Sequence, residues 1–513
     1  MGYKQQTQPQ GHPVSANIEE NIRNYEALFA DCADIKMRKM QLGLNQQVTC
    51  FVAYVETSVG NMLLERSVLG EMINRFCEVP DEQLVNAIRK NHFGISDASP
   101  FATIEEAGDM MLTGDAILFV DGYDKALKIA DKGYPAKAVK ETDSEKANRG
   151  SNEGFAESIK VNTALIRKRI RSPKVKVKEQ KLGVRSKTNV DIVYVDDLVD
   201  ITLIEKIEQR LSEYEVDGVL DSGIIEQLSE KSWVSPFPQF QTTLRPDRAA
   251  MALLEGRVVL LSDNSPVALI IPSDYNSFIQ TSDDYYNRWE IASFTRLLRY
   301  AASVLAMILP GLYLAVTNFH TQLLPTALLL SFAQARAGVP FPGVVEILIM
   351  ELSFELLREA GTRLPAALGS TIGIVGGLII GQAAVEANIV SGMVVIIVAF
   401  TALCSYAIPN TEFAAAFRLL KFIFIFLCAF LGLYGLLIGI ILLLVHLSRL
   451  ESFDIPYLTP FVGSSNRQTD EADSLIRPPY FTLKKRPLFA NEKQKVRLRR
   501  NQKQSEKNNK RKN

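Results

Sequence analysis

The sequence predicts a multi-domain protein in which an N-terminal cytosolic α/β region of two subdomains precedes an all-α polytopic membrane domain. Three observations lead to this fold class. Apolar residues make up 47% of the 513 residues, which is high for a soluble protein, and their excess lies after residue 297. Before that point, strand-like and helix-like patterns alternate along the chain. After it come uncharged stretches that are long enough to cross a bilayer.

The N-terminal region begins with a short segment that is expected to be disordered. Residues 1–16 are polar and contain Pro9, Gly11 and Pro13. Subdomain 1 is assigned to residues 17–145. Its expected elements are a helix from Ile18, a strand at 48–56, a helix at 67–76, and two strands within 116–131 around an Asp-Gly turn at 121 and 122.

Subdomain 2 is assigned to residues 146–290 and has the same α/β character. Its expected elements are a helix at 152–170, strands at 174–183 and 187–197, a helix at 199–214, a short strand at 217–221, and a hairpin of 256–263 and 266–272. Four basic residues near the end of its first helix, Arg167, Lys168, Arg169 and Arg171, are interpreted as a solvated helix end. No nucleic acid partner is expected, because aromatic residues are not interleaved with this cluster.

The membrane domain is assigned to residues 291–455. Four spans are expected, at about 300–317, 366–385, 389–409 and 420–446, with a partial or re-entrant segment after the first, where Pro310, the polar stretch 318–322 and Pro325 interrupt the apolar pattern. The last span contains 24 uncharged residues at 422–445, which is long enough to tilt in the bilayer.

The charge distribution predicts the topology. Residues 477–513 carry fourteen Lys and Arg against two Glu, so the segment 456–513 is expected to be a basic cytoplasmic tail. No apolar signal precedes the N-terminal region, which is therefore expected to stay in the cytoplasm as well. Four spans place both ends on the same side, although Arg418 and Lys421 then lie outside, against the positive-inside rule.

A charged helix is predicted to begin at Gly343, before the second span. At 100° per residue, Glu351, Glu355, Arg358 and Glu359 share one side, and Glu346 lies opposite. Consecutive carboxylates at i,i+4 repel each other unless a cation relieves them. Two interpretations remain open, an interfacial helix with an internal salt bridge and a stripe that faces water or ions. The candidate ion-pathway or transduction residues are Glu346, Glu351, Glu355, Arg358, Glu359 and Arg363.

A ridge of glycines follows in the second span. Gly369, Gly373, Gly377 and Gly381 recur at every fourth position and form three overlapping GxxxG units. Such a ridge lets another helix approach closely, either within one subunit or between subunits.

The motifs of common enzyme classes are missing from the sequence. There is no Walker A motif, no G-x-S-x-G, no HExxH and no dinucleotide fingerprint. The five cysteines are widely spaced without any CxxC, so neither a disulfide framework nor a metal site is expected. We therefore expect a protein that is not an enzyme and that has no cofactor.

Several stretches in order resemble the A subunits of the GerA family, the bacterial spore-germination nutrient receptors. The similarity covers residues 17 to about 460. The stretches in the soluble half are RGSNEGFAESIKVN (149–162), IRKRI (166–170), SPFPQ (235–239), RPD (245–247), GRV (256–258) and DDYYNRW (283–289). Those in the membrane half are FTRLLRY (294–300), ELLREAGTRLP (355–365), TIGIVGGLIIGQAAVEANIVS (371–391) and SFDIPYLTP (452–460).

The resemblance implies a multi-pass subunit in the inner membrane of a spore. It would work with a multi-span, transporter-like B subunit and a lipoprotein C subunit, and would turn nutrient binding into germination. It could do so as a homo-oligomeric, nutrient-gated ion channel. The alternative is a component of a secondary transporter, although such proteins usually show more spans and an internal repeat.

Overall fold

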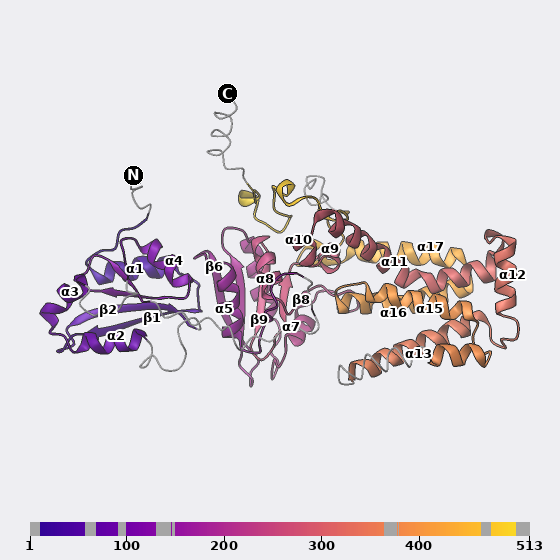
Figure 1. Cartoon of the computed structure of the whole chain (residues 1–513), viewed down its shortest axis with the longest axis horizontal. Helices are drawn as coiled ribbons and strands as arrows, with labels where there is room; N and C mark the ends of the chain where they lie inside the picture. The colour runs from indigo at the N-terminus through magenta and orange to yellow at the C-terminus, as the bar shows by residue number, and fades with distance from the viewer. Residues whose placement is uncertain are drawn as a thin grey trace, which may run out of the picture. The chain divides into compact units, whose positions relative to one another are not determined.

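The computed structural model describes residues 11–56, 68–90, 99–129, 145, 149–363, 377, 379–462 and 473–498 (Figure 1). The chain divides into two units. The first comprises Met1–Glu230, Phe240–Pro272 and Leu483–Asn513, and the second comprises Lys231–Gln239 and Ser273–Thr482. The first unit is α/β and the second is mostly helical, which confirms the predicted fold class.

The first unit begins with a five-stranded antiparallel sheet covered by helices on both faces. Its elements are α1 (Ile18–Leu28), β1 (Ile35–Leu42), β2 (Val48–Val55), α2 (Val68–Cys77), α3 (Asp81–Arg89), β3 (Ser99–Phe101), α4 (Ile104–Leu112), β4 (Ala116–Val120) and β5 (Ala126–Ile129). The strand order is β1-β2-β4-β5-β3. Because successive side chains alternate across a strand, Phe51 and Phe119 pack with α1 and α4, whereas Val52 and Leu118 pack with α2 and α3.

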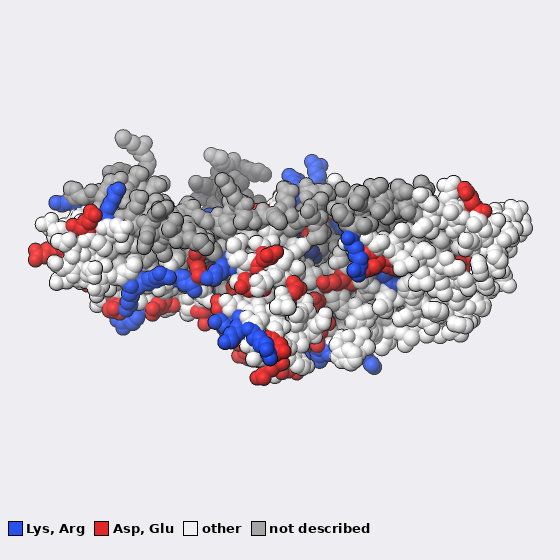
Figure 2. Space-filling model, turned by 90° about the horizontal axis from the view of Figure 1, so that it is seen from below, with Lys and Arg blue, Asp and Glu red and all other residues white. Residues whose placement is uncertain are grey.

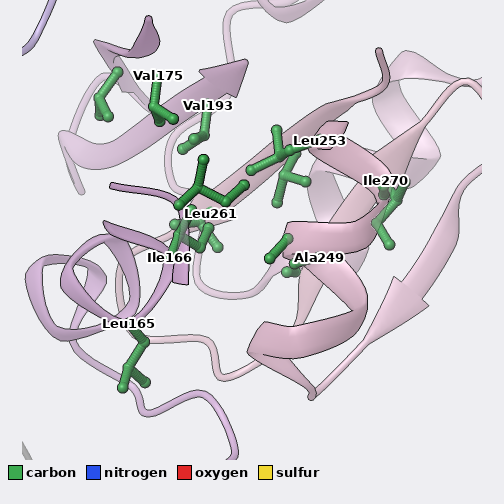
Figure 3. Packing of buried hydrophobic residues seen from close by; sticks show 14 of the residues in the cluster. Leu165, Ile166, Val175, Val193, Ala249, Leu253, Leu261 and Ile270 are labelled. Carbon is green, nitrogen blue, oxygen red and sulfur yellow. The ribbon is translucent and has the colours of Figure 1, made fainter. Parts of the chain in front are cut away.

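A second five-stranded antiparallel sheet follows in the same unit. Its elements are α5 (Ile159–Arg169), β6 (Val175–Leu182), β7 (Thr188–Val195), α6 (Ile201–Leu211), α7 (Ser222–Ser229), β8 (Gln241–Thr243), α8 (Pro246–Leu254), β9 (Val258–Ser262) and β10 (Ala268–Ile271). The order is β6-β7-β9-β10-β8. Figure 3 shows the core between this sheet and helices α5 and α8, where Ile166 and Leu253 lie close to Val193 and Leu261.

The two sheets repeat one topology. In each half a helix precedes a hairpin, two helices follow it, and then come a short edge strand, a helix and a second hairpin. The hydrogen bonds repeat too. The side chain of Asn21 bonds both backbone groups of Ser15, through the N–H and the C=O, as the side chain of Asn162 does with Ala156. Asp121 accepts from Ile18 N as Asp263 accepts from Ile159 N, at 3.2 Å in both cases.

A buried ion pair joins the two halves of this unit. Arg167 is fully buried and forms a bidentate pair with Asp34 at 2.7 and 2.9 Å. Beside it, Val177 N donates to Asp31 O and Ala33 N donates to Val177 O. The interpretation of Arg167 as part of a solvated helix end is therefore wrong. The Arg167 guanidinium pairs with a carboxylate that is distant in the sequence. The basic cluster around Arg167 does not indicate this partner.

Most predicted elements of the first unit are confirmed, with two exceptions. Residues 217–221 form no strand, and α5 begins at Ile159 instead of 152. The later start has a local reason, because the Asn162 side chain bonds the backbone of Ala156 and holds the preceding segment in a turn. Strand β1 is not evident from its sequence, since charged residues interrupt its apolar pattern.

The second unit contains the apolar helices. Its helices are α9 (Tyr275–Ile279), α10 (Asp283–Tyr286), α11 (Trp289–Phe319), α12 (Thr326–Ala335), α13 (Gly343–Arg363), a helical stretch at 379–386, α15 (Gly392–Tyr406), α16 (Thr411–Leu431) and α17 (Leu433–Arg449), and β11 (Glu451–Ser452) pairs with β12 (Ile455–Pro456). In the described residues, α11 and α16 are long and apolar enough to cross a membrane, and α12, α15 and α17 are shorter apolar helices. On the face shown in Figure 2, this unit carries few charged side chains.

The predicted span at 420–446 is wrong as a single helix. Gly432 has φ +59° and ψ −137° and separates α16 from α17, which turns back along α16. This backbone conformation is open to glycine and strained for other residues. Pro310, in contrast, lies inside α11 and does not interrupt it.

Both expected terminal tails take part in folded contacts. Residues 1–10 lie outside the described part, but Val14 is buried and its N–H donates to Ala102 O. In the segment 456–513, Tyr457 is fully buried in the helical unit, and Phe489 is buried beneath Arg257 in the first unit. Both segments were predicted to be tails, but apolar and aromatic residues within them pack against the folded units.

Candidate functional site

The predicted charged helix exists as α13, and its carboxylates meet cations from α16. Glu351 and Glu355 lie on α13, one turn apart, and Arg418 and Lys421 lie on α16. The two helices are distant in the sequence but belong to the same helical unit. The contact between α13 and α16 has two parts, a buried ion pair and a carboxylate shared by several cations.

The buried pair consists of Glu351 and Lys421. Lys421 Nζ lies 2.5 Å from Glu351 Oε2, and the two side chains are only 5% and 2% exposed. Taking two charges out of water is costly, and only close approach and further hydrogen bonds offset that cost. The second oxygen of Glu351, Oε1, has no hydrogen-bond partner among the described residues. The pair is therefore close but incompletely satisfied.

Glu355 is shared by three cations. Its carboxylate lies 3.1 Å from Arg418, 3.5 Å from Lys421 and 3.7 Å from Arg358. Arg358 also donates to Ser405 Oγ on α15 at 3.1 Å. In the sequence of α13 alone, one arginine of the stripe accompanies three carboxylates. In the structure Arg418 and Lys421 are added, so the stripe has no surplus of negative charge.

Glu346 has a separate environment, as its position opposite the stripe predicts. It is fully buried and accepts a hydrogen bond from the backbone N–H of Ser391 at 2.8 Å. Ser391 is the N-cap residue of α15, where a carboxylate is favoured by the helix dipole. Arg336 lies 3.4 Å from the other oxygen of Glu346. Glu346 thus links α13 to the start of α15.

The remaining two candidates, Glu359 and Arg363, form an exposed pair. Their side chains are 62% and 79% exposed and lie 2.7 Å apart at i,i+4. Exposed pairs of this kind contribute little to stability. They are therefore suitable controls for the buried pair.

The glycine ridge lies mostly outside the described residues. This applies to Gly369 and Gly373. A Cβ built on Gly377 meets no atom within 4 Å, and one on Gly381 lies 3.5 Å from Val395, an ordinary contact. Among the described residues, no neighbouring helix lies so close to Gly377 or Gly381 that a side chain would be excluded, so the packing role of the ridge remains a prediction.

A second charged cluster, near the start of α11, was not singled out by the sequence argument. Arg296 is fully buried beside Asp284, at 3.3 Å, and Asp473, at 2.9 Å. Arg299 forms two hydrogen bonds with the Asp284 carboxylate, at 2.6 and 3.0 Å. These residues belong to the DDYYNRW and FTRLLRY stretches, so the charges within those stretches could have revealed them. Asp473 brings a distant segment to the same cluster, and no local pattern indicates that contact.

The described residues contain no group of three His, Cys, Asp or Glu side chains that could hold a metal ion. All five cysteines are free thiols. The α13–α16 contact itself consists of ion pairs.

Comparison with known proteins places this architecture in a family. Residues 23–489 match the profile of GerA, the Bacillus/Clostridium GerA spore germination protein. The chain is 40% identical to the uncharacterized membrane protein YfkQ of Bacillus subtilis, over 93% of this chain and 92% of that protein. It is 36% identical to spore germination protein KA of the same organism, over 94% and 88% of the two chains.

The chain is also similar to a solved structure, the crystal structure of the N-terminal domain of the A subunit of the Bacillus megaterium spore germinant receptor GerK3. The match covers 51% of this chain and 97% of that chain, with 26% identity and a TM-score of 0.40. The family profile spans most of the chain, and relatives above 30% identity are covered over nearly their whole length. The chain therefore belongs to the GerA family of spore germination proteins.

Proposed function

We propose that this GerA-family membrane protein acts as the A subunit of a nutrient-germinant receptor and transmits the nutrient signal through the charged contact between α13 and α16. The protein would lie in the inner membrane of the spore, with its N- and C-terminal regions in the cytoplasm. Its partners would be a multi-span, transporter-like B subunit and a lipoprotein C subunit. This role requires no catalytic step. The family supports the role in germination, and the contact supports the mechanism.

The observation that carries the mechanism is the buried pair of Lys421 and Glu351. Lys421 lies within α16, which is long enough to cross a membrane, and ionisable residues in such helices are costly and usually functional. Glu351 Oε1 and Arg418 Nε are both buried without a hydrogen-bond partner among the described residues. Buried polar groups without partners are costly, so a second arrangement that pairs them would compete with this one. Such a two-state element is what signal transmission requires.

The finer part of the proposal is that the signal opens a cation path in a homo-oligomer. Glu355 is the most exposed carboxylate of the contact, at 26%, and three cations neutralise it. A shift of α13 relative to α16 would separate Glu355 from Arg418 and leave a carboxylate facing the path. Acidic side chains in such positions favour cations.

Conductance measurements test the channel directly. The purified chain is incorporated into planar bilayers with and without its two partner subunits, and nutrient is added. Nutrient-dependent cation current in the complete complex supports the proposal. Normal assembly without any current would refute the channel and leave the receptor role to be tested by germination itself.

A further inference from the structure

The loop Lys231–Gln239, which belongs to the helical unit, has a buried base. Gln239 is 2% exposed, and its side-chain oxygen accepts from Lys231 N at 3.2 Å and from Ser232 N at 3.4 Å. Its amide nitrogen donates to Ser232 O at 3.2 Å. Ser452 Oγ donates to Gln239 O at 2.7 Å. These bonds tie the two ends of the loop together and fix them to β11.

The middle of the loop is fixed to the end of the α16–α17 hairpin. Phe237 is 1% exposed, and its ring lies 5.8 Å from that of Phe413 and 5.6 Å from that of Phe417, near the start of α16. Ser235 Oγ lies 2.9 Å from His446 Nε2, in the last turn of α17. The loop is therefore held at the end of the hairpin where α16 begins and α17 ends.

The tip of this ordered loop is apolar and uncovered. Trp233 is 82% exposed and Val234 is 75% exposed, although the residues on either side of them are held in place. Trp233 is two residues from Ser235, so its backbone lies within about 7 Å of the Ser235 backbone. Two large apolar side chains exposed at the end of an apolar hairpin are stable only in surroundings that accommodate both the indole ring of Trp233 and its N–H group.

We propose that Trp233 and Val234 insert into the interfacial layer of the lipid bilayer. Tryptophan is enriched at that depth because its ring is apolar while its N–H still finds polar partners. The position supports this occupant, since the loop is packed against the ends of helices that carry lipid-compatible surfaces. The proposal rests on α11 and α16 crossing the membrane. It does not depend on how the receptor signals.

Fluorescence quenching tests the insertion, because the chain contains two tryptophans, Trp233 and Trp289. The variant Trp289→Phe leaves Trp233 as the reporter. The full-length protein is placed in vesicles of phosphatidylcholine and phosphatidylglycerol whose acyl chains are brominated either near the headgroup or near the bilayer centre. We expect loss of Trp233 emission with the shallow bromine, much less loss with the deep bromine, and protection from iodide in the water.

Two results would overturn the proposal. The first is quenching by iodide with no loss of emission in brominated lipid, which would place the tip in water. The second is protection from both quenchers, which would indicate cover by protein, such as a second copy of the chain. If Trp289→Phe does not fold, the difference between the wild-type protein and Trp233→Phe gives the same comparison.

Discussion

Burial of a single carboxyl group makes the first unit sensitive to pH. Asp191 on β7 is 7% exposed, and desolvation, with smaller contributions from Glu179, Asp34 and Asp263, raises the pKa of Asp191 to about 7. A hydrogen bond from Thr163 Oγ1 at 3.0 Å partly opposes this shift. In the unfolded chain an aspartate titrates near pH 3.9. Between these two values the folded state binds the proton and the unfolded state does not.

We therefore expect the first unit to lose stability as pH rises from about 4 to about 7, by up to about 4 kcal/mol in free energy of unfolding. Asp191→Asn removes the titrating group and keeps an oxygen that accepts from Thr163. The variant should be more stable than the wild type at pH 8 and similar to it at pH 4. Amide exchange of β7 in the full-length protein measures the opening free energy at both values. If the opening free energy depends on pH equally in the two proteins, Asp191 is not the group that makes the first unit sensitive to pH.

At the residue scale, sequence periodicity finds one side of the charged contact. The spacing of Glu351 and Glu355 follows from helical geometry, and α13 presents both to α16. The partners Arg418 and Lys421 could not be assigned, because they are distant in the sequence and helix pairing is not encoded locally. The sequence did contain one sign of this pairing, because Arg418 and Lys421 conflict with the positive-inside rule. Cations buried within the protein need carboxylates nearby.

At the element scale, glycines determine how the α16–α17 hairpin closes. A Cβ built on Gly435 would lie 2.1 Å from the backbone oxygen of Leu427 on α16. Only a shift of α17 away from α16 could relieve that clash. The residue therefore marks a close approach of the two helices.

Gly435→Ala should destabilise the helical unit by about 1 to 3 kcal/mol, the usual cost of overpacking. Gly392→Ala is the matched control, because a Cβ at the first residue of α15 meets no atom within 4 Å. The control should match or exceed wild-type stability, since alanine favours helices over glycine. The thermal midpoint of each full-length variant in detergent is the measurement. Equal midpoints for both variants would mean that the hairpin is not closely packed at Gly435.

The same elements show what a sequence can predict about a membrane region. The uncharged length at 422–445 indicates apolar helix, but it does not distinguish one long span from two helices folded together. The distinction depends on the backbone at Gly432, where one positive φ reverses the chain. In the first unit, the alternation of apolar and charged residues predicted β6, and the strand-like composition of the apolar stretches predicted β2 and β7.

At the scale of the whole molecule, the repeated topology of the first unit was not visible in the sequence. The two halves share hydrogen bonds at equivalent turns, including those of Asn21 and Asn162, while their core residues differ. A fold tolerates such changes if volume and patterning are kept. The joint between the halves is also asymmetric. Asp34 of the first half pairs with Arg167 of the second half. Lys174 occupies the position in the second half that is equivalent to Asp34, but it pairs with Asp197 of its own half.

At the level of the assembled protein, we propose that the pair of Glu351 and Lys421 transmits the signal as well as stabilising the fold. Loss of one partner does not separate these roles, because Lys421→Met alone leaves a buried, uncompensated carboxylate and should destabilise the protein by about 3 to 5 kcal/mol. Glu351→Gln combined with Lys421→Met removes both charges at similar volume, an exchange that is often neutral for stability. Arg418 and Arg358 still compensate Glu355 in this variant.

Nutrient-triggered cation release per assembled receptor in spores carrying the Glu351→Gln/Lys421→Met variant is the most direct measurement. Glu359→Gln, which breaks only the exposed pair with Arg363, is the control and should release cations normally. We expect the doubly neutral receptor to assemble at the wild-type level but to release cations weakly or not at all. Release at the wild-type rate per receptor would contradict this expectation, and would show that the buried pair only stabilises the contact between α13 and α16.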